Sequence, residues 1–298
     1  MTASVPARGS RHVIRVPASM GNVGPGFDTL GLALTLYMRV TVRRRIDDGQ
    51  GRLVAHFATE RPVAQNGIAR AFEHWPFRVA RPLSLEVDVA SDIPERAGLG
   101  SSAAAAVAGL RLRELCDGRR TIDELASAAV ALEGHPDNAA AVLHGGLTSS
   151  RVGDDGAVIV GRWRWPAAWR IVVATPHVQL ATKDSRRVLP LRVPIGDAVF
   201  NLQRVALLLH AVDTRSAAEL TAAVQDRLHQ PYREPLVPVL ARALSLRHPD
   251  VMGGCLSGAG PSVALFARRN PRGVERALAT LYRKEGVPCT VRVLRVHQ

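Results

Sequence analysis

The segment Pro94–Ala106 reads PERAGLGSSAAAA and decides how the first half of the chain is interpreted. Gly98 and Gly100 allow a tight turn and a close approach of the backbone to a ligand. Ser101 and Ser102 occupy the positions of an N-cap and a first helical turn, and the alanines that follow favour a helix. The free N–H groups at the positive end of that helix would face the loop. We therefore predict an anion site here, with phosphate as its natural ligand.

This loop differs from the two common phosphate-binding motifs. It is not a P-loop, because no lysine follows the glycines, and it lacks the GxGxxG spacing of a dinucleotide site. The chain contains only two lysines, Lys183 and Lys284. The charge of a bound phosphate must then be met by the helix N-terminus, a metal ion and arginine. Taken alone, a glycine-rich turn before a helix is also typical of an ordinary loop-to-helix junction.

Three other segments favour the functional interpretation. Val16–Leu34 reads VPASMGNVGPGFDTLGLAL, Glu133–Gly146 reads EGHPDNAAAVLHGG, and Gly253–Ser262 reads GGCLSGAGPS. Singly they are typical of an Asx-capped loop, a helix start with proline at its first position, and a hairpin of small residues. In this order, the four segments together resemble the motifs of the GHMP small-molecule kinases. The combination of NxGPGFD with HPDN is most similar to the homoserine kinase branch, and the resemblance runs from about residue 12 to the end.

Hydrophobic periodicity and turn residues predict the elements of an α+β protein. The second half follows a β-α-β-β-α-β order, which is the ferredoxin-like pattern. The resemblance adds a two-domain GHMP kinase fold, with an N-terminal ATP-binding domain (1–165), a C-terminal ferredoxin-like domain (166–298) and an active site between them. The predicted strands are His12–Pro17, Leu32–Arg44, Leu53–Phe57, Leu83–Ala90, Arg170–Thr175, Val251–Leu256, Ser262–Phe266 and Pro288–Val296. The predicted helices are Ala64–His74, Ser101–Cys116, one opened by the Thr121–Glu124 capping box, Pro136–Leu143, Ile195–Val212, Leu236–Arg247 and Arg272–Glu285.

The resemblance implies ATP and Mg²⁺ as cofactors. Mg²⁺ takes hard oxygen ligands, usually one or two from the protein together with phosphates and water. The matching ligand positions in this chain are Ser102 and Glu133. The glycine segment near the C-terminus is expected to pack against the phosphate loop and to close the nucleotide site. The residues assigned to the nucleotide in this way are Pro94, Gly98, Leu99, Gly100, Ser101, Ser102, Ala103, Gly258 and Gly260.

The resemblance also assigns residues to the substrate. Asn22 and Asn138 are expected near its hydroxyl and Asp28 near an ammonium group. Asp137 matches the base of other branches, and the sequence leaves open whether it removes a proton or only contacts the substrate amine. The catalytic set is therefore Asn22, Asp137 and Asn138, and the substrate-binding set is Asn22, Asp28, His135, Asp137, Arg186 and Arg233.

Arginine is the residue expected to bind a substrate carboxylate, because its planar fork matches the two carboxylate oxygens. Arg186 in SRRVLP and Arg233 in PYREP match the carboxylate-binding arginines of the family. Among 39 lysines and arginines, each alone would be taken as a surface residue. Arg187 is an immediate rival for the role of Arg186.

Composition restricts the class of protein. The hydrophobic content of 47% and the mean hydropathy of +0.03 are typical of a soluble protein with a sizeable core, and we expect no run to span a membrane. The net charge of +13 is almost all scattered arginine, and with 4% aromatic residues it does not indicate a nucleic-acid partner. Residues 1–11 lack the apolar core of a signal peptide and are expected to form a short disordered tail. The widely spaced Cys116, Cys255 and Cys289 suggest reduced thiols in a cytoplasm.

The expected activity is ATP-dependent phosphorylation of the hydroxyl of L-homoserine to O-phospho-L-homoserine, a step towards threonine. Homoserine and ATP are then the small-molecule partners, and a homodimer is left open. The alternatives are another small alcohol, namely threonine, mevalonate or a diphosphocytidyl-methylerythritol, and a non-catalytic nucleotide-binding protein. Two arginines favour an acidic substrate, Asp28 favours an amine, and a non-catalytic protein would lack the magnesium ligands.

Overall fold

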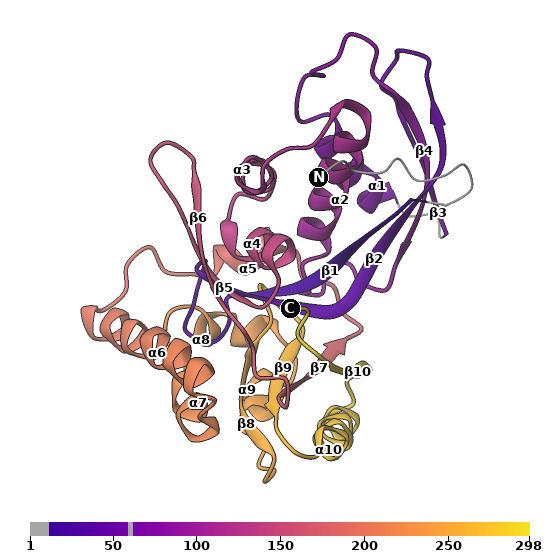
Figure 1. Cartoon of the computed structure of the whole chain (residues 1–298). Helices are drawn as coiled ribbons and strands as arrows, with labels where there is room; N and C mark the ends of the chain where they lie inside the picture. Colours follow the sequence, from indigo (N-terminus) through magenta and orange to yellow (C-terminus); the bar gives the residue numbers. More distant parts are fainter. Residues whose placement is uncertain (1–11, 59–61) are drawn as a thin grey trace.

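Two β-sheets, one from each half of the chain, organise the molecule (Figure 1). The computed structural model describes residues 12–58 and 62–298, so the tail predicted at residues 1–11 lies outside the described part. The first sheet has the order β3-β4-β2-β5-β6, with β1 paired to β2, and only β3 and β4 run parallel. Its strands are β1 (Val13–Gly21), β2 (Leu30–Ile46), β3 (Leu53–Phe57), β4 (Ser84–Ser91), β5 (Leu147–Val152) and β6 (Val158–Trp163).

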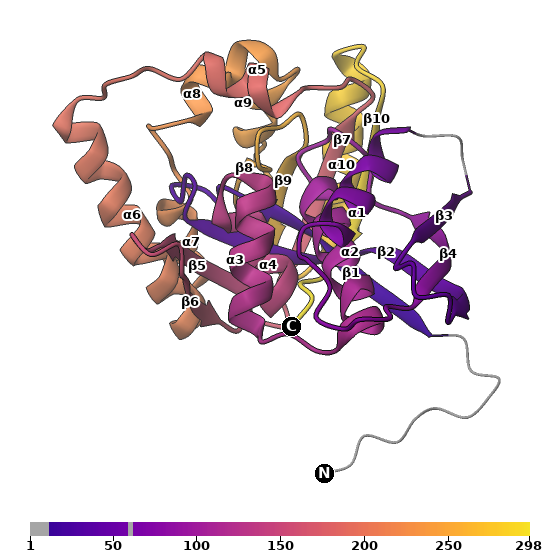
Figure 2. The same ribbon diagram turned by 90° about the horizontal axis from the view of Figure 1, so that it is seen from above.

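Four helices cover the first sheet (Figure 2). The second of them follows the predicted phosphate loop, and it packs against both β1 and its neighbouring helices. A capping box at Thr121 and Glu124 starts the third helix, as the sequence predicted. These helices are α1 (Pro62–Phe72), α2 (Ser101–Asp117), α3 (Ile122–Glu133) and α4 (Pro136–His144).

The second sheet has the order β10-β7-β9-β8, and every pairing in it is antiparallel. In chain order this is 4-1-3-2, so the predicted ferredoxin-like pattern and the α+β class are confirmed. Its strands are β7 (Arg170–Pro176), β8 (Val251–Leu256), β9 (Val263–Ala267) and β10 (Cys289–Leu294). The remaining elements are α5 (Thr182–Arg187), α6 (Ile195–Thr214), α7 (Ala217–Ala223), α8 (Gln230–Arg233), the 3₁₀ helix η1 (Glu234–Leu236), α9 (Leu240–Leu244) and α10 (Pro271–Lys284).

The single helix predicted at Leu236–Arg247 was wrong. Within this range only α9 forms an α-helix, over Leu240–Leu244, and the short α8 and η1 come before it, with η1 ending at Leu236. Pro231, Pro235 and Pro238 explain the breaks, because proline lacks an N–H and its ring excludes a continuous helix. The short α8 is important for the site, since its last residue is Arg233.

The two halves are joined by the C-terminal residues as well as by the chain between β6 and β7. Leu34 of β2 forms a β-bridge with Val296. The amide of Thr35 donates to the carbonyl of Arg295 at 2.9 Å, and the amide of Gly146 donates to that of His297 at 2.7 Å. The last residues therefore fix the position of the second sheet relative to the first.

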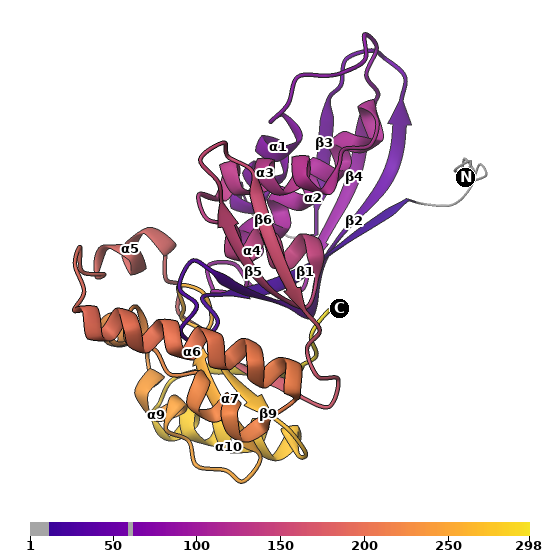
Figure 3. The same cartoon turned by 60° about the vertical axis from the view of Figure 1, so that its left-hand side comes forward.

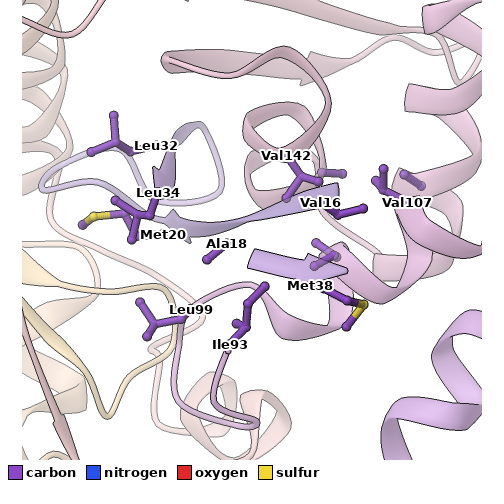
Figure 4. Close-up of a cluster of buried hydrophobic side chains, with 14 of the residues drawn as sticks. Val16, Ala18, Met20, Leu32, Leu34, Met38, Ile93, Leu99, Val107 and Val142 are labelled. Carbon is purple, nitrogen blue, oxygen red and sulfur yellow. The ribbon is translucent and has the colours of Figure 1, made fainter. Parts of the chain in front are cut away.

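The core of the first half holds the phosphate loop in place (Figure 4). Val16, Ala18 and Met20 alternate along β1 and are buried. Ile93 and Leu99, from the segment between β4 and α2, are 3% and 1% exposed and belong to the same core. Burying such a side chain contributes about 1.5–3 kcal/mol. The apolar residues of the loop thus anchor it to the core.

One helix departs from the expectation that no run could span a membrane. By length and composition alone, α6 is long and apolar enough to cross a membrane. Only 22% of its most apolar stretch is buried. It lies along the outside of the second half (Figure 3).

Candidate active site

Most of the residues predicted for the site lie around one cavity between the two halves. The cavity is lined by the β1–β2 turn, the loop before α2, the α3–α4 junction, α5, α8 and the β8–β9 loop. The predicted residues that line it are Asn22, Asp28, Gly98, Leu99, Gly100, Ser101, Ser102, Glu133, His135, Asp137, Asn138, Arg186, Arg233 and Gly258.

Three of the predicted nucleotide residues are not among the cavity-lining residues. Ala103 is a fully buried residue of α2, and Pro94 precedes the part of the loop that reaches the cavity. A Cβ at Gly260 would lie 3.0 Å from a methyl of Val237, so this glycine packs against the second half. Leu99 reaches the cavity only along its backbone, because its side chain belongs to the core.

Steric fit explains both glycines of the phosphate loop. Gly98 and Gly100 have φ of +73° and +67°, where residues with a Cβ are strained. A Cβ at Gly100 would also lie 2.1 Å from Oγ of Ser19, and one at Gly98 would lie 2.1 Å from the carbonyl oxygen of Ser257. No side chain fits at either position, because Ser19 and Ser257 pack directly against these glycines.

The start of α2 differs from the prediction in one respect. Its N-cap is Gly100, and no side chain caps the helix, so Ser101 is not the cap. The first helical bond runs from the amide of Ala104 to Gly100, which leaves the preceding amides without helical acceptors. The hydroxyl of Ser102 instead donates to Oε1 of Glu133 at 2.7 Å. The helix therefore begins with free N–H groups at the cavity, as an anion site requires.

The β8–β9 loop joins the phosphate loop to the end of β1. Oγ of Ser257 donates to the carbonyl of Gly98 at 2.6 Å, and the amide of Gly258 donates to Gly21 at 3.0 Å. Nδ2 of Asn22 donates to the carbonyl of Gly258 at 3.0 Å. Three segments far apart in the sequence thus meet at one wall of the cavity.

Both polar atoms of the Asn22 side chain form hydrogen bonds to backbone groups. Its Oδ1 accepts from the amide of Asp28 at 2.8 Å, and its Nδ2 is held by Gly258. Asn22 and Asp28 both adopt positive φ, +55° and +50°, which asparagine and aspartate tolerate better than most residues. Asn22 therefore shapes the turn that presents Asp28, and this is the structural role weighed for it in the sequence.

Asp137 lies at the centre of a buried polar cluster at the start of α4. The residue is 1% exposed. Its Oδ2 accepts from the amide of Asn22 at 3.1 Å, and its Oδ1 accepts from the amide of Asn138 at 2.8 Å. Oγ of Ser19 donates to Oδ1 of Asn138 at 2.8 Å. Nδ1 of His135 lies 3.6 Å from Oδ1 of Asp137, and contact with this carboxylate raises the pKa of His135.

Opposite charges also meet in the lining of the cavity. A terminal guanidinium nitrogen of Arg186 lies 2.6 Å from Oδ1 of Asp28. Arg187, in contrast, is exposed and pairs with Asp184 outside the cavity. The guanidinium groups of Arg186 and Arg233 lie 5.5 Å and 5.3 Å from the ring centre of Phe27. Of the two adjacent arginines, Arg186 is the one that reaches the site.

Arg233 is a buried cation without a carboxylate partner within 4 Å in the described part of the chain. It is 1% exposed, and burial, followed by the charge of Arg186, lowers its pKa to about 10. Nε donates to the carbonyl of Ser185, and a terminal nitrogen donates to Gly258, each at 3.2 Å. Burying an unpaired charge is costly, so an arginine held in this way at a cavity indicates an anionic ligand.

The sequence did not single out His229, which lies behind these residues. It is fully buried; its Nε2 lies 2.9 Å from the carbonyl of Gly24, and its Nδ1 lies 3.2 Å from a terminal nitrogen of Arg233. A carbonyl only accepts and a guanidinium only donates, so these partners fix the neutral tautomer with the proton on Nε2. Desolvation lowers the pKa of His229, which also favours the neutral ring. The ring also stacks on Phe27, at 5.5 Å between centres.

Ser19 and His229 were missed because their contacts are with residues far away in the sequence. Ser19 stands in the quoted segment Val16–Leu34, but nothing there indicates its contact with Asn138. His229 stands in none of the quoted motifs, although it lies one helical turn before Arg233, a spacing at which side chains meet. Four residues that do line the cavity were also missed, and one of them, Arg96, places a cation beside the phosphate loop. They are Arg96, Ala97, Thr182 and Ala259.

Ser102 and Glu133 form a pair suited to a hard cation. Their oxygens converge at 2.7 Å, and burial raises the pKa of Glu133, so a cation here would offset the cost of its charge. No group of three or more His, Cys, Asp and Glu residues that could hold a metal is found among residues 12–58 and 62–298. Mg²⁺ does not require such a group, because phosphate oxygens and water complete its six ligands.

The chain was compared with family models, and two models match. That of the GHMP kinases N terminal domain matches residues 64–146, and that of the GHMP kinases C terminal matches residues 207–284. The first match contains the phosphate loop and the α3–α4 junction, and the second contains Arg233 and the β8–β9 loop.

Curated relatives and solved structures agree with these matches. A homoserine kinase from Moorella thermoacetica is 39% identical, over 95% of this chain and 96% of its own. One from Solibacter usitatus is 37% identical, over 92% and 90%. The crystal structure of homoserine kinase from Cytophaga hutchinsonii has a TM-score of 0.84 at 23% identity, covering 100% of this chain and 98% of that one. The mevalonate kinase of Methanococcus jannaschii has a TM-score of 0.69 at 13% identity, covering 98% and 100%, so it shares the fold.

Proposed function

This chain belongs to the GHMP kinases, and we propose that it transfers the γ-phosphoryl group of ATP to the side-chain hydroxyl of L-homoserine. The product is O-phospho-L-homoserine. The observation that carries the choice of substrate is the buried Arg233, which has no carboxylate partner within 4 Å among the described residues and lines the cavity. It calls for an anion, and a substrate carboxylate is of the right size and charge.

The neighbouring charges favour an α-amino acid over a simple carboxylic acid. Asp28 carries a negative charge within reach of the same space, paired at 2.6 Å with Arg186. A zwitterion placed between them offers its ammonium to Asp28 and its carboxylate to Arg186 and Arg233. Mevalonate has a carboxylate and a hydroxyl but no ammonium, so it would leave Asp28 without a cation from the substrate.

The nucleotide phosphates are proposed to bind where α2 begins. The free amides there and the helix dipole supply positive potential without a lysine, and Arg96 adds a charge from the loop itself. Ser102 and Glu133 would hold Mg²⁺, which would neutralise charge on the β- and γ-phosphates. Two hydrogen bonds keep this wall rigid beside the reacting atoms. One runs from the amide of Asp28 to Oδ1 of Asn22, and the other runs from the hydroxyl of Ser19 to Oδ1 of Asn138.

The transfer itself needs little covalent chemistry from the protein. The hydroxyl oxygen forms a bond to the γ-phosphorus, the bond to the bridging oxygen of ADP breaks, and ADP leaves. The hydroxyl proton has two acceptors, the carboxylate of Asp137 and an oxygen of the transferred phosphoryl group. The Asp137→Asn variant distinguishes between these two proton acceptors. Loss of most of kcat with an unchanged KM for homoserine would assign the proton to Asp137, and a change in KM alone would make Asp137 a substrate contact.

A panel of alcohols with Mg²⁺ and ATP, followed by release of ADP, tests the proposal. We expect turnover of L-homoserine, and no turnover of mevalonate, glycerol or a diphosphocytidyl-methylerythritol. L-Threonine keeps both charges but carries its hydroxyl one carbon closer to them, so we expect it to bind without efficient transfer. Turnover of mevalonate at the rate of homoserine would contradict the proposed substrate.

We propose that the enzyme is cytoplasmic. The state of its cysteines supports this, because they are unreactive thiols. Cys116, Cys255 and Cys289 form no disulfide within the described residues. Burial raises the pKa of Cys116 to about 11 and that of Cys255 to about 12, so neither thiol ionises near neutral pH. Incubation with a thiol reagent should therefore leave activity intact unless the protein is unfolded.

A further inference from the structure

A buried serine of β1 contacts the start of α4. Ser19 is fully buried, and its hydroxyl donates to Oδ1 of Asn138 at 2.8 Å. Asn138 stands in the first turn of α4, lines the cavity and is predicted to lie near the reacting hydroxyl. Ser19 itself is not among the residues that line the cavity. Its hydroxyl can therefore influence the reacting atoms only through Asn138.

Two hydrogen bonds define which way the side-chain amide of Asn138 points. Its Nδ2 donates to Oδ1 of Asp137 at 3.3 Å, and its Oδ1 accepts from Ser19. An ionised carboxylate only accepts hydrogen bonds, so a flipped amide would place two acceptors against each other. Nδ2 carries two hydrogens, and Asp137 is its one acceptor within the described part of the chain. Asn138 therefore keeps one N–H for a ligand.

The strand and the phosphate loop enclose these two side chains. Ser19 and Gly21 lie on the same face of β1, because side chains alternate along a strand. A Cβ at Gly21 would lie 2.5 Å from Nδ2 of Asn138, so the amide packs directly on the strand. A Cβ at Gly100 would lie 2.1 Å from the hydroxyl oxygen of Ser19. The hydroxyl of Ser19 thus lies between the phosphate loop and the amide of Asn138.

The backbone of Ser19 makes a separate connection to the phosphate loop. Its amide donates to the carbonyl of Leu99, between the two glycines of that loop, at 3.2 Å. Ser19 therefore contacts the loop proposed to hold the phosphates through its backbone, and Asn138 through its side chain. Replacement by alanine removes the hydroxyl and keeps the backbone amide, so mutation can separate the two contacts.

We propose that Ser19 is a positioning residue for phosphoryl transfer, because its hydroxyl holds the amide of Asn138 in the orientation that leaves an N–H for the reacting groups. This role presupposes the kinase activity proposed for the site. Phosphoryl transfer depends mostly on positioning and charge stabilisation, so the orientation of one amide affects its rate. The last side-chain torsion of asparagine has a broad energy minimum. Without the hydroxyl of Ser19, Oδ1 of Asn138 loses its partner and the amide can turn.

The kinetics of Ser19→Ala test this role. We expect kcat to fall by about tenfold, through the loss of one buried hydrogen bond. The KM for the alcohol and the dissociation constant of ATP should change little, because the charged residues and the contact with Leu99 remain. Parent-like kcat in folded Ser19→Ala would overturn the proposal. If alanine disturbs the fold, Ser19→Cys gives the same test, since its thiol fills the space but donates weakly.

Ser84→Ala is the matched control. Ser84 of β4 is also buried in the first sheet, and its hydroxyl donates to a side-chain oxygen, Oδ1 of Asp48, at 2.7 Å. It does not line the cavity. This variant should lose stability towards urea and keep the kcat of the parent. An equal loss of kcat in Ser84→Ala and Ser19→Ala would overturn the proposal, because any lost buried hydroxyl would then have the same effect.

A double-mutant cycle with Asn138→Ala tests whether Ser19 acts through Asn138. In the Asn138→Ala background, Ser19→Ala should change kcat by less than about twofold, because no amide remains to be oriented. Transfer of radiolabelled phosphate from ATP measures the slow variants. The same fold-loss of kcat in both backgrounds would overturn the proposal. The cycle can use any alcohol that the parent phosphorylates, so failure of homoserine would contradict the proposed substrate and not the role of Ser19.

Discussion

Asp28 and Arg186 form an ion pair in the lining of the candidate site, with a carboxylate oxygen of the first 2.6 Å from a guanidinium nitrogen of the second. Asp28 comes from the β1–β2 turn, and Arg186 comes from α5 in the second half of the chain. Their side chains are 32% and 38% exposed, and ion pairs at such positions contribute about 0–1 kcal/mol. A substrate that brings one charge of each sign can therefore replace this pair at little cost.

The first prediction concerns the two arginines. Arg186→Ala should raise the KM for homoserine tenfold to a hundredfold, because a charge-assisted hydrogen bond contributes about 1.5–3 kcal/mol. Arg233→Lys, which keeps the charge in the buried position, should act in the same direction through loss of the planar fork. The dissociation constant of ATP, measured by calorimetry, should change little in both.

Arg187→Ala is the control for these variants, since Arg187 is exposed and pairs with Asp184 outside the cavity. It should behave as the parent protein. If Arg186→Ala or Arg233→Lys abolished ATP binding and left the KM for homoserine alone, the arginine concerned would belong to the nucleotide site.

The second prediction concerns the phosphate loop. Gly100→Val should weaken ATP binding more than any other single change considered for this loop, because the new Cβ would collide with Ser19 and the backbone would be strained. Gly118→Val is the matched control at the other end of α2. Gly118 also has a positive φ, +99°, but nothing lies within 4 Å of its added Cβ. It should lose stability and keep its ATP affinity. An unaltered ATP affinity in folded Gly100→Val would show that the phosphates bind elsewhere.

The third prediction concerns the cation site. Glu133→Gln should remove most of kcat, because it removes the charge of a proposed magnesium ligand while keeping its shape. Ser102→Ala should act in the same direction more mildly, since water can replace a hydroxyl on Mg²⁺. ATP should still bind to both, and the concentration of Mg²⁺ needed for half-maximal rate should rise. A normal magnesium dependence in Glu133→Gln would remove this residue from the cation site.

The fourth prediction concerns His229, which joins Arg233 to the turn that carries Asp28. Gln supplies both an acceptor for Arg233 and a donor for Gly24, so His229→Gln should largely keep the KM for homoserine. His229→Leu should raise that KM, because it removes the acceptor that His229 offers to the guanidinium of Arg233 and the donor that it offers to the carbonyl of Gly24. Similar kinetics in these two variants would show that His229 acts only by filling space.

His229 also predicts a pH dependence of stability. Its pKa is lowered in the folded state, so the unfolded chain binds the proton more readily. Stability should therefore fall as the pH drops below the unfolded value of about 6.5, by at most about 1.4 kcal/mol per pH unit. Urea unfolding of His229→Gln should lack this contribution between pH 6.5 and 5. An equal loss of stability in the variant over that range would assign the effect to other groups.

Local sequence signals predicted the elements best where the signal lies within a few residues. The strand Leu53–Phe57 and the capping box of Thr121 and Glu124 are formed as predicted. The α6 helix was also recognised, but periodicity alone does not reveal that its apolar stripe faces outwards. The cap at Ser101 was wrong because Gly98 and Gly100 already shape the turn, and Ser102 is drawn towards Glu133.

The site residues that could be predicted from the sequence are those that stand in contiguous motifs. Gly98, Gly100 and Asp137 stand in such motifs, and they line the cavity. Ser19 contacts Asn138 across 119 residues, and His229 contacts Gly24 across 205, so these contacts depend on the packing of the two halves. Nothing near either residue in the sequence indicates its partner.

The most direct test of the zwitterion account compares homoserine with two truncated alcohols. 4-Hydroxybutyrate lacks the ammonium, and 3-amino-1-propanol lacks the carboxylate, while both keep the reacting hydroxyl. Release of ADP with saturating Mg²⁺ and ATP gives kcat/KM for each. We expect each truncated alcohol to fall at least tenfold to a hundredfold below L-homoserine, the size of one lost charge-assisted contact. Equal kcat/KM values for the three alcohols would show that Asp28, Arg186 and Arg233 do not recognise the substrate and would contradict the account.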